Sequence, residues 1–163
     1  MMPTSVEVSD DWTVADGKTV TIADGPGPYA ITCIDATSTY DIVSTGGGVL
    51  DSTRAERWNG TSWTTQTTPN PGATDVFSGV SCFSASVCTA VGSYAESNAE
   101  PTGPSAEGWN GTTWTGQTTP SPAGADESPL NSVSCIAAST CTAAGEYQNS
   151  SGTYLTLAER ESG

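Results

Sequence analysis

Hydrophobic positions in this chain occur in short runs that alternate with small polar residues, and no segment carries a helical apolar stripe. Residues 62–67 (SWTTQT) and 113–118 (TWTGQT) alternate threonine with larger side chains, which is the period of a β-strand with one buried face. Asn-Gly at 59–60 and 110–111 precedes each of these strands and predicts a type I′ hairpin turn. We therefore expect an all-β fold with negligible helix.

The strand pattern repeats along the chain at a period of about 50 residues, the length of a four-stranded β-propeller blade. AERWNGTSWTTQ at 55–66 returns as AEGWNGTTWTGQ at 106–117, and GVSCFSASVCTAVG at 79–92 returns as SVSCIAASTCTAAG at 132–145. A degenerate copy, AITCIDATSTYDIVSTGG, starts at residue 30. The repeats predict a β-propeller type of fold with three four-stranded blades per chain.

We interpret residues 1–163 as a single repeat domain in which the last unit stops before its fourth strand. The sequence DGKTVTIADGPGP at 16–28 aligns with NGTSWTTQTTPNP at 59–71, which puts Val20 at the position of Trp63. An N-terminal strand near Thr19–Ile22 is thus expected to complete the unfinished blade. The predicted parts are a closing strand or hairpin at 12–28, a degenerate blade unit at 29–71, a second unit at 72–122 and an incomplete third unit at 123–163.

The combination of WNGTSW, TTPNP and SC-x5-CTAVG resembles the tandem repeats of secreted or surface β-propeller-like proteins of actinobacteria, which are loosely kelch-like. The resemblance covers nearly all of the chain after about residue 12. It implies a propeller-like fold and a secreted or cell-surface location in a bacterium. It implies no defined activity.

Four of the five cysteines form two pairs with the same spacing, Cys82 with Cys88 and Cys135 with Cys141. Without histidine nearby, this spacing is a weak zinc pattern and favours a disulfide across a strand–turn–strand unit. Two such disulfides would imply an oxidising compartment. Cys33 has no partner at this spacing and is interpreted as a buried core residue, with an intermolecular thiol as the alternative.

Charge and composition exclude several classes of function. The formal net charge of −14 makes nucleic acids and anionic membrane surfaces poor partners. The absence of histidine removes Ser-His-Asp and Cys-His catalysis as well as histidine zinc sites. No apolar run is long enough to insert into a membrane. We expect no cofactor and no metal.

Three blades do not close a ring, because known propellers have at least about four. The two uncovered blade faces would need a partner. The favoured solution is a homodimer that makes six blades, with the N-terminal strand of each copy completing the last blade of the other. An open filament built by the same strand exchange is the second possibility, and an excerpt from a longer array of repeats is the third.

Candidate binding residues are the five tryptophans. Aromatic faces line sugar-binding sites, so a carbohydrate or protein ligand at the rim is one interpretation. Packing between blades is the alternative, since four of these residues recur on either side of an Asn-Gly turn. The predicted ligand-binding positions are Trp12, Trp58, Trp63, Trp109 and Trp114.

The carboxylates give little support for catalysis. Glu56, Glu107 and Glu159 share one repeat position, whereas a glycosidase needs two carboxylates facing each other across about 5–10 Å. Asp10-Asp11 and Asp126-Glu127 lack the spacing of a calcium loop. The sequence thus predicts a non-enzymatic, self-assembling extracellular module. The alternatives are a structural subunit of a filament or surface layer and, less favoured, a glycoside hydrolase-like enzyme.

Overall fold

The computed structural model describes residues 12–13, 19–20, 29–33, 40–45, 53–58, 63–96 and 103–161. Every regular element in these ranges is a β-strand, which confirms the all-β prediction. Within the same ranges, no helix long and apolar enough to cross a membrane is found.

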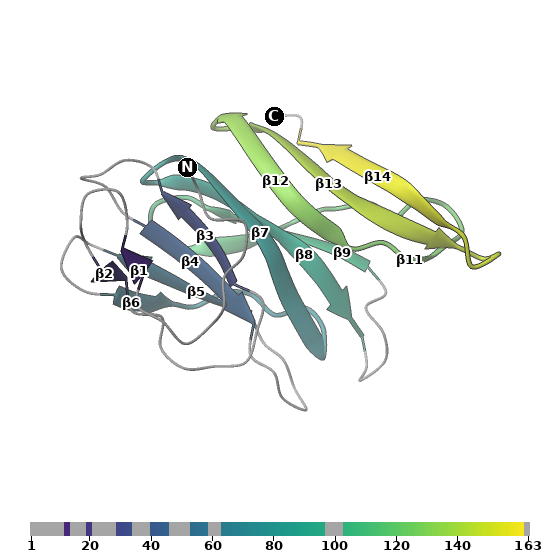
Figure 1. The fold of residues 1–163 in the computed structure, drawn as a ribbon, viewed down its shortest axis with the longest axis horizontal. Coiled ribbons are helices and arrows are strands. Elements are labelled where there is room, and N and C mark those ends of the chain that lie inside the picture. Colours follow the sequence, from purple (N-terminus) through teal and green to yellow (C-terminus); the bar gives the residue numbers. More distant parts are fainter. Residues whose placement is uncertain are drawn as a thin grey trace.

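The strands form one two-stranded pair and three four-stranded antiparallel sheets (Figure 1). In the first two large sheets, strand order follows chain order. In the third sheet β12, β13 and β14 also follow chain order, and β11 pairs with the far end of β13 beyond β12. The N-terminal pair is β1 (Trp12–Thr13) and β2 (Thr19–Val20); the first sheet is β3 (Tyr29–Cys33), β4 (Tyr40–Thr45), β5 (Thr53–Trp58) and β6 (Trp63–Gln66); the second sheet is β7 (Thr74–Ser84), β8 (Val87–Ala95), β9 (Gly103–Trp109) and β10 (Trp114–Gln117); the third sheet is β11 (Ala125–Glu127), β12 (Leu130–Ala137), β13 (Thr140–Asn149) and β14 (Tyr154–Arg160).

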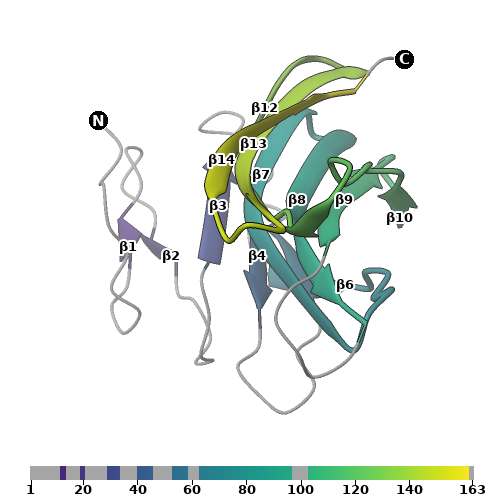
Figure 2. The same ribbon diagram turned by 90° about the vertical axis from the view of Figure 1, so that its right-hand side faces the viewer.

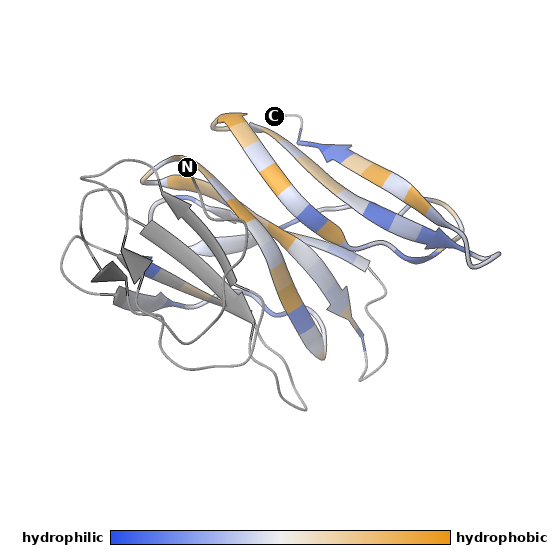
Figure 3. Cartoon of the chain, in the orientation of Figure 1, coloured by the Kyte–Doolittle hydropathy of each residue, from blue (hydrophilic) through white to orange (hydrophobic). Residues whose placement is uncertain are grey.

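The second sheet lies between the other two, so that both of its faces are covered (Figure 1), and the three sheets overlap when the molecule is viewed from the side of the third sheet (Figure 2). Strands β3 and β4 pack against β7 on one face, and β12 packs against β7 and β8. Strand β8 is accordingly buried on successive residues, which its small side chains permit. Strand β13 instead alternates near its start, with Cys141 and Ala143 buried and Thr142 and Ala144 exposed. The hydropathy bands along β12 and β14 show the same alternation (Figure 3).

Two hydrophobic cores hold the sheets together. The first interface, between the first and second sheets, contains Ala55, Phe77, Cys88, Ala90, Trp109 and Trp114. The second interface, between the second and third sheets, contains Val91, Ala106, Leu130, Ala143 and Leu157. A direct hydrogen bond also joins the inner strands β7 and β12, since the backbone N–H of Cys135 donates to Ser81 Oγ at 3.0 Å.

The turn between β9 and β10 differs from the type I′ hairpin expected from Asn-Gly. A type I′ turn needs positive φ at two successive residues. Among the described residues only glycines have positive φ, and here it is Gly111 alone, at 93°. Asn110 Oδ1 instead accepts hydrogen bonds from the backbone N–H groups of Thr112 and Thr113, both at 2.9 Å. The asparagine side chain therefore closes a four-residue loop, and the predicted turn type is wrong at this position.

The second threonine of the TTP sequence that follows β6 and β10 makes a hydrogen bond back to the third strand of its sheet. Thr68 Oγ1 donates to the Thr53 carbonyl at 2.7 Å, and Thr119 Oγ1 donates to the Pro104 carbonyl at 2.8 Å. In both sheets the second threonine thus ties the end of the fourth strand back to the start of the third. The hydroxyl supplies the bond where proline has ended the ladder.

Both predicted disulfides are present, and each joins directly opposed residues of neighbouring strands. Cys82 faces Cys88 across β7 and β8, and Cys135 faces Cys141 across β12 and β13. In the first sheet the residue opposite Cys33 is Tyr40, so the same local disulfide cannot form there. The side chain of Cys33 lies outside the described residues, and its role stays a prediction.

Removing the Cys82–Cys88 disulfide by double alanine substitution is expected to lower the free energy of unfolding by about 2 kcal/mol, because the short cross-link restricts the unfolded chain. Denaturant unfolding of the variant and of the unmodified chain measures the loss. As a control, thiol labelling of the unfolded protein before reduction should modify no more than one of the five cysteines. Labelling of three cysteines would show that one cross-link does not form, and labelling of all five that neither does.

Candidate functional site

The two described tryptophans of the second unit lie inside the first interface. Trp109 is 7% exposed and Trp114 is 4% exposed. Their ring centroids are 5.7 Å apart, and Trp114 Nε1 donates a hydrogen bond to Gln66 Oε1 at 2.8 Å. The guanidinium of Arg57 lies over the Trp109 ring at 5.4 Å from its centroid. Both rings therefore have the packing role that competed with ligand binding, and little of either is left for a ligand to contact.

The other three candidate tryptophans are placed only as strand positions. Trp58 and Trp63 face each other at the ends of β5 and β6, in the register that Trp109 and Trp114 also have. Trp12 lies opposite Val20 in the N-terminal pair. The side chains of these tryptophans lie outside the described residues, and ligand binding by them stays a prediction.

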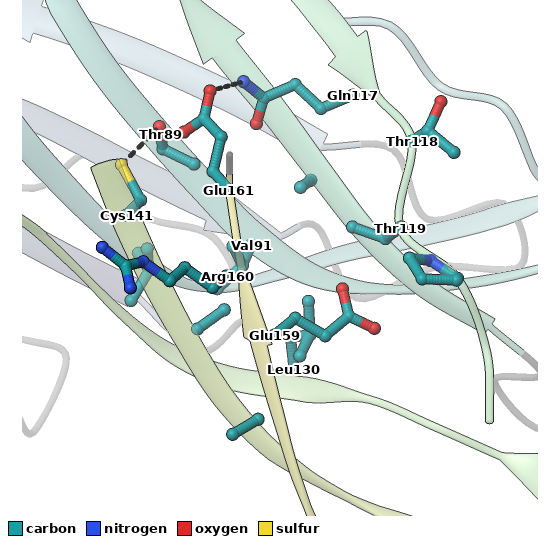
Figure 4. A pocket seen from close by; sticks show the side chains of 15 residues that line it. Thr89, Val91, Gln117, Thr118, Thr119, Leu130, Cys141, Glu159, Arg160 and Glu161 are labelled. Atoms are coloured by element: carbon teal, nitrogen blue, oxygen red, sulfur yellow. Dashed lines mark hydrogen bonds between the residues drawn. The ribbon is translucent and has the colours of Figure 1, made fainter. Parts of the chain in front are cut away.

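The second interface opens toward β10 and β14 into a cavity of about 570 Å³, which we call the β14 groove (Figure 4). Gln117 Nε2 donates to Glu161 Oε1 across it at 3.2 Å. Deeper in the groove, Thr89 Oγ1 lies 3.4 Å from Cys141 Sγ. Its remaining lining includes Val91, Ala106, Thr118, Thr119, Pro120, Leu130, Val133, Ala143, Ala158, Glu159 and Arg160.

The β14 groove occupies the place that two indole rings fill in the first interface. The residues around those indoles and the residues that line the groove hold equivalent positions in successive repeat units. Gly92 and Gly145 hold the same repeat position. Gly92 pairs with Ser105 and Gly145 pairs with Leu157, so Leu157 corresponds to Ser105 and, four residues further on, Glu161 corresponds to Trp109. No described residue stands at the place of Trp114. The related pairs are Ala55 with Ala106, Gln66 with Gln117, Phe77 with Leu130, Val80 with Val133, Cys88 with Cys141 and Ala90 with Ala143.

Strand β14 also has a free edge beside the groove. Among the described residues it pairs with β13 alone. The N–H of Glu161 donates to the Cys141 carbonyl on β13 at 3.0 Å. Because N–H groups alternate in direction along a strand, those of Ala158 and Arg160 point away from β13. These backbone groups are available to a further strand.

Two carboxyl groups of the groove are only partly satisfied. Glu159 Oε1 and Glu161 Oε2 are buried atoms without a hydrogen-bond partner. Burial raises the pKa of Glu159 above its ordinary value. The floor of the groove is thus apolar, and its β14 side carries hydrogen-bond acceptors without partners. This arrangement favours a ligand with a positive charge or hydrogen-bond donors.

A second pair of carboxyl groups is buried in the first interface. Asp75 is 2% exposed and Glu107 is 3% exposed. Burial, and then the charge of Asp75, raise the pKa of Glu107 to about 8. Burial also raises the pKa of Asp75, although its carboxylate accepts hydrogen bonds from the Gly72 N–H at 3.1 and 3.2 Å. Glu107 is therefore neutral at pH 7, which lets the pair coexist without a second buried charge.

Glu107 also lines a separate cavity of about 460 Å³, together with Asn70, Tyr94 and Thr118. Two neighbouring carboxyl groups near a cavity are the feature that would favour a glycoside hydrolase. Here Asp75 is not part of the cavity wall, and both groups are almost completely covered. The arrangement therefore fits a pair of carboxyl groups buried within the interface better than the catalytic pair of a glycoside hydrolase.

Metal ligands do not gather in the described ranges, where no group of three or more His, Cys, Asp and Glu side chains is suitably placed. Asp126 is exposed and its neighbour Glu127 is half-buried. Asp10 and Asp11 lie outside the described residues.

Sequence reasoning missed both the β14 groove and the buried Asp75–Glu107 pair. The repeat alignment held a signal for the first, because it puts glutamate at 161 where the second unit has Trp109. It held none for the second, since Asp75 is replaced by Ser128 in the third unit. Comparison of the chain with protein-family models, with curated proteins and with solved structures finds no match.

Proposed function

We propose that this protein is a non-catalytic, extracellular module of the β-propeller type that assembles with further copies of itself and binds a ligand on its rim. Three consecutive four-stranded sheets stacked face to face, with their inner strands β3, β7 and β12 next to one another, support a blade arrangement. The two disulfides are compatible with an extracellular location. The resemblance to secreted actinobacterial repeats points the same way.

One observation carries the self-assembly. The second sheet packs against the third sheet through one face. The third sheet has counterparts of the residues of that face, and these counterparts are exposed. Val91 is 1% exposed in the second interface, whereas its repeat counterpart Ala144 is exposed. The residues of the covered face are Ser81, Thr89, Val91 and Ala106, and their exposed counterparts are Ser134, Thr142, Ala144 and Ala158.

A repeated face of this kind receives a sheet from another copy. Contacts between unlike faces give a ring if the rotation closes and a filament if it does not. Two copies of three sheets would make a six-bladed ring, which lies within the usual size of propellers. We therefore favour the homodimer, with a filament or surface-layer subunit as the second candidate because the same face would also support open growth.

The rim offers an apolar site for a ligand. Phe83 and Ile136 follow the first cysteine of each disulfide, and they are 51% and 76% exposed. They lie at the same end of neighbouring sheets, near the turns that connect β7 to β8 and β12 to β13. A row of exposed apolar side chains favours a protein ligand over a carbohydrate. Residues 97–102, between β8 and β9, lie outside the described residues.

Native mass spectrometry tests the assembly. The unmodified chain is expected at twice its own mass, and Ala144→Arg is expected to weaken self-association about tenfold because it places a long charged side chain on a contact face of small residues. Ala138→Arg carries the same charge on the exposed turn of the third sheet and should leave the dimer unchanged. A chain that stays monomeric at every concentration would contradict the proposal. Particles that lengthen with concentration would establish the filament.

A further inference from the structure

We propose that the β14 groove accepts a β-strand from a second copy of this chain, residues 16–22, which adds to the free edge of β14 and places Val20 where Trp114 stands in the first interface. This inference rests on the self-assembly proposed above. It specifies one contact between neighbouring copies, the pairing of residues 16–22 of one copy with β14 of another.

The first interface shows which residues fill the place that corresponds to the groove. In the first interface a fourth strand, β10, pairs with β9 and directs Trp114 between Phe77 and Gln66. In the second interface the corresponding residues, Leu130 and Gln117, line an open cavity of about 570 Å³. No described residue fills this place in the second interface, although the residues around it correspond to those around Trp114.

The free edge of β14 supplies the backbone half of this contact. The register of β9 with β10 pairs Gly108 with Thr115 and Ala106 with Gln117. Their counterparts on β14 are Arg160 and Ala158, whose N–H groups point away from β13. A strand that adds here with Val20 opposite Glu161 places Thr21 opposite Arg160, where it would make the hydrogen bonds that Thr115 makes with Gly108.

Residues 16–22 are the occupant that the chain itself offers. Their alignment with the Asn-Gly-and-Trp segment sets Asp16-Gly17 on the turn and Val20 at the tryptophan position. Strand β2 pairs with β1 and, among the described residues, not with β14 of its own chain. One edge of β2 is occupied by β1, so its other edge can pair with the β14 of a partner copy.

Charge complementarity supports the same occupant. In the first interface Arg57 covers Trp109, and in the second interface these two repeat positions hold Gly108 and Glu161. The groove therefore gains a carboxylate and loses the cation that would lie near it. Residues 16–22 contain Lys18, the single lysine of the chain, two positions before Val20. In the proposed antiparallel register Val20 lies opposite Glu161 and Ile22 lies opposite Glu159, so Lys18 is a diagonal neighbour of Glu161, whose Oε2 is unsatisfied.

Photo-crosslinking identifies the occupant. A benzophenone amino acid is introduced at position 20, and equal amounts of ¹⁴N- and ¹⁵N-labelled protein are mixed, dissociated, reassociated and irradiated. We expect cross-links from position 20 to peptides containing Gln117 or Glu161, about half of them joining a light and a heavy chain. Cross-links confined to chains of one label would show that the chain fills its own groove. Cross-links that avoid residues 103–161 would show that position 20 does not enter the groove. Either result would overturn the proposal.

A gain of affinity provides an independent test. Val20→Trp should lower the dissociation constant of self-association about tenfold, because an indole fills the groove better than valine. Thr19→Trp adds the same ring to the opposite face of the strand and should produce no gain. Lys18→Glu should raise the dissociation constant several-fold. Equal effects of Val20→Trp and Thr19→Trp, or no effect of either Val20→Trp or Lys18→Glu, would overturn the inference.

The two proposals fail separately. If Ala144→Arg abolishes the dimer while the position-20 variants leave the dissociation constant unchanged, sheet stacking stands and strand donation falls. If the chain is monomeric and cross-links only within itself, both proposals fall.

Discussion

Replacing Trp114 by alanine is expected to lower the free energy of unfolding by about 3–5 kcal/mol, the cost of removing a large aromatic side chain from a packed core. The ring is 4% exposed and contacts both Phe77 and Trp109, so its removal leaves a cavity that rigid neighbouring strands cannot close. Denaturant unfolding measures the loss.

Trp114→Phe serves as the control for this prediction. It retains an aromatic ring and loses the 2.8 Å hydrogen bond from Nε1 to Gln66, so about 1–2 kcal/mol is expected. A sugar-binding tryptophan would instead be replaced with little loss of stability. A cost below about 1 kcal/mol for Trp114→Ala would therefore contradict the packing role and favour a ligand shelf.

Raising the pH from 5 to 8.5 is expected to lower the free energy of unfolding by about 2–4 kcal/mol through Glu107. Its pKa is about 8 in the folded chain against an ordinary value of 4.5, so between these values the folded state holds a proton that the unfolded state has released. The stabilisation is fully present below the ordinary pKa and is lost as the pH rises through the folded one. Burial of Asp75 and Glu159 acts in the same direction.

Glu107→Gln isolates this contribution, because the amide keeps the shape of the carboxylic acid and stays neutral. The variant should match the unmodified chain near pH 5 and be more stable at pH 8.5, so that most of the pH dependence disappears. Glu159→Gln is the matched control at the same repeat position, where the side chain is less buried and a smaller effect is expected. If both variants keep the full pH dependence, the proton lies elsewhere.

The repeat made much of the fold predictable. The strand segments and both disulfides follow from patterns that recur between units, with the tryptophan pair shared by the first and second units and the cysteine spacing by the second and third. The turn after Trp109 was predicted in place and wrong in type, because Asn-Gly allows a type I′ turn and the Asn110 side chain can equally close a longer loop. Side-chain hydrogen bonding of this kind is local and depends on strand length that propensity does not specify.

The candidate site was harder to predict. The sequence left both ligand binding and packing between blades open for Trp109 and Trp114, and only the stacking of the first sheet on the second shows that they are buried. The pKa of Glu107 likewise depends on Asp75, which lies 32 positions earlier in the chain and on a strand that is not a neighbour of β9. Burial and charge–charge distances are properties of the packed sheets, so periodicity along one strand cannot supply them.

Alternation, repetition and cysteine spacing by themselves determined that this chain forms β-strands, that the strands recur in units and that two cross-links bridge neighbouring strands. These are local features, set by side-chain period and by residues a few positions apart. Only the tertiary structure decided which faces are covered, which carboxyl groups lose their water, and that a groove with the lining of the tryptophan core stands open beside β14. Those outcomes depend on how whole sheets stack, because solvent exclusion is a property of the two faces together and of neither sequence segment alone.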